Sequence, residues 1–244
     1  MHTSPSAPGL LPRRGILALG LAGLAGCAVG PQPVVLDRAV MAEVKRIAVP
    51  AVGFPPRPNV RVLNTATDHF GLIGAVAGAI ILNNRLKSVE AMLASRGLDS
   101  RAYFQTALAE RLTARGLTVL PGPADTAGGG FSQAHAVGDG RDAVLDVSVT
   151  TYGFVALNDS DGSPFRPGVG LNTVLVHARD RSVLMRDTVL IDGVAEPVLT
   201  HDGTPLGAPT FKDFREIEAD PDRAVASLRA ALAAAADGVA GKLT

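Results

Sequence analysis

The chain has 244 residues, with 23 basic and 23 acidic side chains, one cysteine and no tryptophan. A neutral chain lacks the excess of positive charge with which proteins bind nucleic acid, so we expect no nucleic-acid partner. A single cysteine excludes an intramolecular disulfide. The length is suited to one domain with a sizeable core.

The N-terminal segment has the pattern of an export signal. Arg13 and Arg14 precede a short apolar run over residues 16–24, and small residues follow up to Cys27. Basic residues, a short apolar run and a small-residue cut site are typical of a secretory signal. The apolar run is too short for a membrane-spanning helix, which needs about 20 apolar residues. An ordinary signal with a chance cysteine remains the alternative.

The sequence Leu24-Ala25-Gly26-Cys27 resembles the lipobox of bacterial lipoproteins. This resemblance implies removal of residues 1–26 and lipid attachment at Cys27. It also implies a place on the periplasmic face of the outer membrane, because Ala28, and not an aspartate, follows the cysteine. We therefore expect the lipid anchor to hold the protein at the membrane.

The first part of the expected mature chain is a lipidated tether over residues 27–40, followed by one periplasmic domain over residues 41–244. A β-branched run over residues 46–52 predicts the first strand. Pro50 moves this strand toward a sheet edge or ends it, because proline donates no backbone hydrogen bond. The proline-rich residues 54–58 then interrupt regular structure.

Two helices and a short strand come next. Apolar residues recur at steps of three and four over residues 70–96, which predicts a helix that ends at Gly97. Asp99 or Ser100 is suited to cap a second helix that runs to Arg115. Residues 117–120 predict a strand. The glycine-rich residues 124–141 lack the Gly-Lys-Ser/Thr of a phosphate-binding loop, so we expect a surface loop there.

Three more strands and a helix complete the prediction. Alternating apolar residues predict strands over 143–155, 169–179 and 183–191. The last two should form an antiparallel hairpin, because only a short polar connection separates them. Residues 193–219 are expected to form a long loop, and a helix capped by Asp220 ends the chain. The element order predicts an α+β fold: a two-layer sandwich with a mainly antiparallel sheet of about five strands and helices on one face.

An unusually apolar and glycine-rich stretch lies within the first long helix. Gly71, Gly74 and Gly78 recur at steps of three and four, a spacing that allows close helix contact. Each glycine costs the helix about 1 kcal/mol relative to alanine, so some close approach should compensate. Three interpretations stay open: core packing, a partner or self-association surface, or lipid contact.

A second candidate partner surface lies before the last helix. Phe211, Phe214 and Ile217 cluster near two basic side chains. If these apolar side chains are exposed, they form a partner patch. If they are buried, they fix the loop under the sheet, which is the interpretation we favour slightly.

The residues give little sign of metal or catalytic chemistry, and we expect no cofactor, no metal and no catalytic residue. Asn158 begins a stretch that faintly resembles a calcium loop, but the closing glutamate is missing. A hydrolase would need His135, His177 or His201 to meet a serine or an acid in space.

The mature part of the chain is similar in plan to a group of small bacterial lipoproteins. This similarity rests on Arg46-Ile-Ala-Val49, on the helix ending Arg111-Leu-Thr-Ala-Arg-Gly116 with Leu117-Thr-Val-Leu120 after it, and on Asp142-Ala-Val-Leu-Asp-Val147. The group contains the curli-secretion lipoprotein, the penicillin-binding-protein activators and transport-auxiliary lipoproteins. The resemblance implies a non-enzymatic accessory or scaffold protein of an envelope assembly, with an envelope protein partner or self-association. A binding protein for an apolar small molecule or lipid is the alternative, and a hydrolase comes third.

Overall fold

The computed structural model describes residues 32–64, 71–122, 140–158, 164–191 and 210–243. The chain divides into two compact units, residues 1–32 and 33–244, and the second contains the helices and strands described below. They are α1 (Arg38–Glu43), β1 (Arg46–Val49), β2 (Asn59–Asn64), α2 (Gly71–Ser95), α3 (Ser100–Ala114), β3 (Thr118–Pro121), β4 (Ala143–Asn158), β5 (Arg166–His177), β6 (Val183–Ile191), α4 (Phe214–Ala219) and α5 (Pro221–Gly241).

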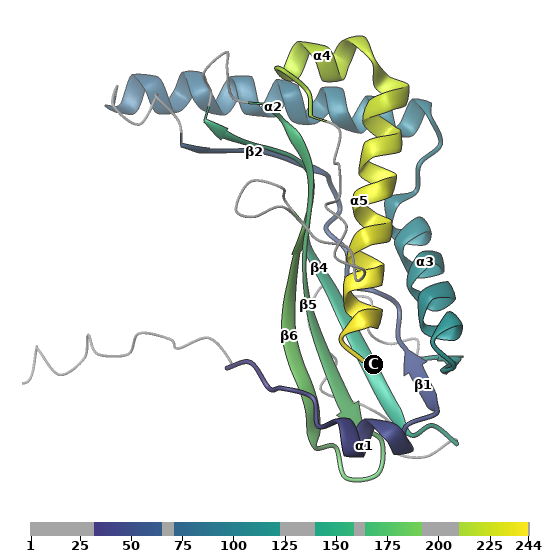
Figure 1. The fold of residues 1–244 in the computed structure, drawn as a ribbon. Coiled ribbons are helices and arrows are strands. Elements are labelled where there is room, and N and C mark those ends of the chain that lie inside the picture. The colour runs from purple at the N-terminus through teal and green to yellow at the C-terminus, as the bar shows by residue number, and fades with distance from the viewer. Residues whose placement is uncertain (1–31, 65–70, 123–139, 159–163, 192–209, 244) are drawn as a thin grey trace, which may run out of the picture. The chain divides into compact units, whose positions relative to one another are not determined.

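The strands form one open, mixed sheet in the order β3-β1-β4-β5-β6, with β2 paired to β4 (Figure 1). The predicted α+β class is confirmed. The sheet has six strands: its two longest pairings, β4 with β5 and β5 with β6, are antiparallel, and three shorter pairings are parallel, namely β1 with β3, β1 with β4, and β2 with β4. Since β4 is 16 residues long, one of its edges takes β1 near Ala143 and β2 from Gly153 onward.

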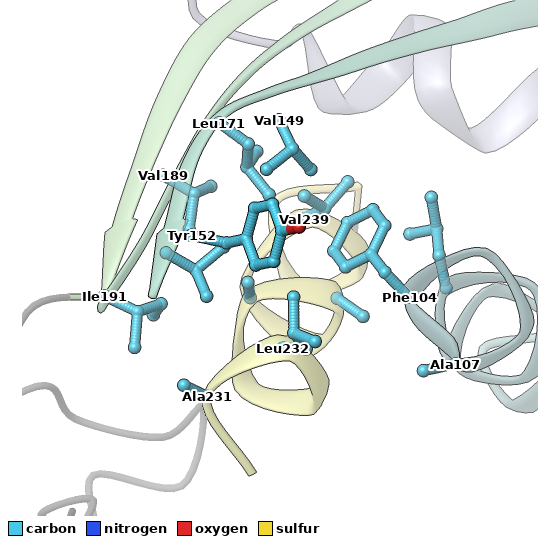
Figure 2. Packing of buried hydrophobic residues seen from close by; sticks show 14 of the residues in the cluster. Phe104, Ala107, Val149, Tyr152, Leu171, Val189, Ile191, Ala231, Leu232 and Val239 are labelled. Carbon is cyan, nitrogen blue, oxygen red and sulfur yellow. The ribbon is translucent and has the colours of Figure 1, made fainter. Parts of the chain in front are cut away.

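The helices α3 and α5 cover one face of the sheet, and α5 packs on β5 and β6 (Figure 1). Figure 2 shows side chains of the strands, among them Tyr152 and Leu171, interleaved with Leu232 and Val239 of α5 and Phe104 of α3. Burial raises the pKa of Tyr152 to about 12. This apolar layer fills the space between sheet and helices and provides most of the hydrophobic stabilisation of the fold.

The helix α5 has the caps that its sequence predicts. The Asp220 carboxylate accepts the backbone N–H of Arg223 at 3.1 Å, and Pro221 occupies the first turn, where it removes no helical hydrogen bond. Within the described part of the chain, α5 is the one helix long and apolar enough to cross a membrane, but 56% of its apolar window is buried inside the domain. The helix therefore behaves as a core helix.

The folded unit begins earlier than the sequence predicted. Val34 forms an antiparallel bridge with Arg186 of β6, and Asp37 caps α1 by accepting the backbone N–H of Ala39 at 2.8 Å. The predicted tether over residues 27–40 thus overlaps with the domain. Two further elements were not predicted: β2 follows the proline-rich stretch, and α4 lies within the expected loop 193–219.

Candidate functional site

Within residues 78–95 of α2, whose side chains the structure describes, the first two turns are mostly exposed and the C-terminal end is partly buried; we call residues 78–84 the exposed half of α2. Near its C-terminal end, Val89 and Leu93 belong to the core, and the Arg85 guanidinium lies over the ring of Phe214 of α4 at 5.4 Å. One turn before Arg85, Ile80 is 57% exposed and Ile81 is 50% exposed. Figure 1 shows this end of α2 continuing past β2. The helix predicted over residues 70–96 is confirmed, and it presents two large apolar side chains to solvent.

Of the three candidate glycines, Gly78 lies in this exposed half of α2, and Gly71 and Gly74 precede it in the helix. Gly78 is half-buried, and it precedes the exposed Ala79 and Ile80. Gly71 and Gly74 belong to the helical backbone, but their surroundings lie outside the described side chains. The choice among core, partner and lipid contact therefore stays open for these glycines. The next turn of the helix is exposed, which argues against a fully buried segment.

A large hollow lined by described residues lies at the opposite end of the domain from the exposed half of α2. We call it the α1 pocket; it has a volume of about 770 Å³ and is lined by residues of α1, β6, the turn after α3 and the C-terminal end of α5. Its apolar lining includes Met41, Val44, Leu117, Met185 and Leu243. Val34, Val35 and Leu36 complete the apolar part from the entering chain.

The charges around the α1 pocket are mostly positive. Its cationic residues are Arg38, Lys45, Arg115, Arg186 and Lys242, and its one acidic residue is Asp187.

Two of these cations have carboxylate partners. Lys242 pairs with Asp187, and Arg115 Nη1 lies 3.4 Å from Asp237 Oδ1. Within the described part of the chain, the side chains of Arg38, Lys45 and Arg186 have no carboxylate at ion-pair distance. This cluster was not predicted from the sequence, because its members come from four separate segments.

The second candidate partner surface is buried. Phe211, Phe214 and Ile217 are 0%, 6% and 1% exposed, so the burial interpretation is confirmed and no exposed patch forms there. Phe211 packs edge-on against Phe154, with ring centroids 5.8 Å apart, and its backbone pairs with Phe165. Phe214 and Ile217 lie on α4, where the sequence predicted a loop.

One of the three candidate histidines lies within the described residues. His177 Nδ1 is 3.0 Å from Asp180 Oδ1, and the same oxygen accepts the Ser182 hydroxyl at 2.7 Å and the Ser182 N–H at 3.0 Å. These bonds lower the pKa of Asp180 to about 2, chiefly through the Ser182 N–H. In a catalytic triad the serine contacts the histidine, whereas here both contact the aspartate. The arrangement stabilises the turn between β5 and β6.

Several predicted features lie outside the described residues. These are residues 1–26, Cys27, most of the glycine-rich loop 124–141, His135, His201, and the stretch after Asn158. Among the residues that the structure does describe, no group of three or more His, Cys, Asp or Glu side chains is placed to hold a metal ion.

No protein-family model, no curated protein and no solved structure matches the chain. The sequence pattern and the geometry of the domain alone therefore bear on its function.

Proposed function

We propose that the protein is a non-enzymatic accessory component of the bacterial envelope, held at the periplasmic face of the outer membrane by a lipid on Cys27. In this proposal the exposed half of α2 contacts a protein partner. Two features support it: the export signal that ends in Cys27, and the pair of exposed isoleucines on α2.

The exposed isoleucine pair carries the proposal. Full burial of a fully exposed isoleucine side chain contributes about 1.5–3 kcal/mol; since Ile80 and Ile81 are 57% and 50% exposed, covering both offers about that amount for the pair. Gly78 and Ala79 next to them have little or no side chain, which allows a partner to approach the helix backbone closely. An apolar helix of a partner protein fits such a surface best.

The lipid would make a weak contact effective. A tether confines the domain near the membrane and raises its effective concentration for a local partner to about millimolar. Two or more acyl chains anchor a protein stably, in contrast to a single chain. Modest apolar contacts on α2 would then suffice for a specific assembly.

A ligand between sheet and helices is a weaker interpretation. Phe104, Leu145, Leu171, Leu228 and Leu232 are each less than 2% exposed and fill that space. A filled core with an exposed apolar helix favours protein contact over an internal ligand site.

A photoreactive residue placed on α2 in living cells tests the contact. We expect a photoreactive phenylalanine at Ile81 to cross-link to one envelope protein of defined mass. The matched control is the same residue at Ala91, which is also exposed on α2. The proposal is wrong if the two positions give the same products, or if Ile81 gives lipid adducts only. Adducts with a second copy of the chain would show that this surface mediates self-association and not contact with a different protein.

The anchor is tested separately. Mass spectrometry of the N-terminal peptide from the membrane fraction should find an acylated Cys27 as the first residue. Cys27→Ser should abolish the modification and the processing. An unmodified cysteine, or a chain that keeps Met1 in the cytosol, contradicts the envelope location.

A further inference from the structure

We propose that the α1 pocket binds an anionic phospholipid, with Arg38, Lys45 and Arg186 around the headgroup phosphate and an acyl chain on the apolar lining. This site is at the opposite end of the domain from the exposed turn of α2, and its binding step does not require the lipid on Cys27.

The size and lining of the pocket suit an amphiphile. Its volume of about 770 Å³ falls within the range of roughly 300–1,000 Å³ that is typical of small-molecule sites. Met41 and Met185 contribute flexible thioether side chains that adapt to an irregular apolar ligand. Val35, at the rim, is 91% exposed and leaves apolar surface that an acyl chain would cover.

The charge distribution indicates an anionic headgroup. The whole chain has zero formal net charge, so the gathering of five cations against one carboxylate is a local feature of this pocket. Asp187 pairs with Lys242, and Asp237 pairs with Arg115 as well as with Arg111, which leaves Arg38, Lys45 and Arg186 for a ligand. Guanidinium groups bind phosphate oxygens through paired hydrogen bonds, and a lysine adds a point charge.

The same features argue against other occupants. The lipid proposed on Cys27 has no anionic group, so it would leave the three cations unused. A nucleic acid would leave the apolar lining uncovered. A phospholipid places a phosphate among the three cations and an acyl chain on the apolar lining. Access of the pocket to membrane lipid rests on the proposed anchor at Cys27, because Val34 lies seven residues after Cys27 and an extended chain of that length spans at most about 25 Å.

Lipid binding can be measured by native mass spectrometry of the full chain in a mild non-ionic detergent. We expect one dioleoyl phosphatidylglycerol to bind per chain, at least about tenfold more tightly than dioleoyl phosphatidylcholine. The triple variant Arg38→Gln, Lys45→Gln, Arg186→Gln should lose this preference. The matched control, Lys87→Gln, Arg215→Gln, Arg229→Gln, removes the same charge from exposed positions elsewhere and should retain it.

A third variant distinguishes loss of binding from misfolding. Val35→Asp introduces a negative charge at the rim on a side chain that is almost fully exposed, so the fold should be unchanged by circular dichroism while phosphatidylglycerol binding weakens about tenfold. Equal binding of the two lipids overturns the proposal, as does an equal loss in the matched control. Displacement of the lipid by millimolar inorganic phosphate would indicate a phosphate site without an acyl requirement and would also overturn it.

The outcome is separable from that of the proposed function. Cys27→Ser should still bind phosphatidylglycerol, and the triple variant should still cross-link from Ile81. Loss of lipid binding in Cys27→Ser would show that the pocket depends on the anchor, contrary to our proposal.

Discussion

Asp142 and Arg46 are joined by three hydrogen bonds, although they lie 96 positions apart in the chain. The Asp142 backbone N–H donates to the Arg46 carbonyl at 2.8 Å, the Asp142 carboxylate accepts the Arg46 N–H at 2.8 Å, and the Arg46 Nη2 lies 3.3 Å from Asp142 Oδ1. The carboxylate also accepts the N–H of Lys45. These bonds fix the start of β1 against the start of β4, in the middle of the sheet.

Asp142→Asn should destabilise the domain by about 1–3 kcal/mol, because the amide has one acceptor oxygen and no charge, so the backbone N–H groups of Lys45 and Arg46 and the Arg46 guanidinium cannot all keep their acceptor. Urea denaturation followed by far-UV circular dichroism measures the change. Glu90→Gln is the control, because the Glu90 pair with Arg57 is on the surface and such pairs contribute little. Equal effects in the two variants would show that the Asp142 bonds do not hold the strands together.

The same carboxylate gives a pH dependence. Burial raises the pKa of Asp142, but the N–H donors of Lys45 and Arg46 and the Arg46 guanidinium outweigh burial and hold the pKa below its ordinary value. Since the folded-state pKa is depressed, its contribution to stability is complete above the ordinary aspartate pKa and is lost as the pH falls through the folded-state value. The stability difference between wild type and Asp142→Asn should therefore shrink in acid.

Gly153→Ala should cost about 3 kcal/mol or more and release β2 from β4. Gly153 has a φ of +143°, and a Cβ at this position would lie 1.9 Å from the Asn59 carbonyl oxygen. Gly116→Ala is the matched control: its φ is +83°, but a Cβ there meets nothing within 4 Å, so it should cost only about 1–2 kcal/mol. Urea denaturation measures the free energy of unfolding of both variants. Gly153→Ala reports steric overlap and backbone strain together, whereas Gly116→Ala reports backbone strain alone. Equal losses of stability would contradict the close approach of β2 to Gly153.

The sequence predicted the elements whose signals are local. The β5–β6 hairpin and α5 were predicted because a short polar connection, an alternating pattern and an Asp-Pro cap all lie within a few residues of one another. Strand β2 was missed, because its partners are residues 153–158 of β4 and its own six residues follow a proline-rich stretch. The parallel pairings were missed for the same reason: strand order depends on contacts between distant segments.

The α1 pocket could not be predicted for a related reason. Arg38 belongs to α1, Lys45 to the connection between α1 and β1, and Arg115 to the turn after α3. Arg186 belongs to β6 and Lys242 directly follows α5, and none of these segments has a charge run. The apolar run of α2, by contrast, was visible in the sequence. Only the structure distinguishes its exposed half near Ile80 from its buried half near Val89.

Phe211→Ala should destabilise the domain by about 3–5 kcal/mol, the usual cost of removing a buried aromatic side chain. Phe211 is fully buried against Phe154, and the Arg223 guanidinium lies 4.5 Å from its ring centroid. The control Leu190→Ala removes a side chain that is 53% exposed and should change stability by about 0.5 kcal/mol or less. A Phe211→Ala variant with unchanged stability would restore the partner-patch interpretation of this segment.

The turn between β5 and β6 provides a test of the Asp180 bonds. The Asp180 pKa is lowered from its ordinary 3.8 to about 2, first by the Ser182 N–H, then by the Ser182 hydroxyl and His177. Because the folded-state pKa is depressed, the carboxylate stabilises the turn above about pH 4 and this stabilisation is lost as the pH falls toward 2.

Carboxyl-carbon NMR titration should find a midpoint near pH 2 for Asp180. Ser182→Ala keeps the N–H bond and loses the hydroxyl bond, so the midpoint should rise part of the way toward 3.8. An unchanged midpoint would mean that the Ser182 hydroxyl donates elsewhere, for instance to His177, and would reopen the hydrolase interpretation.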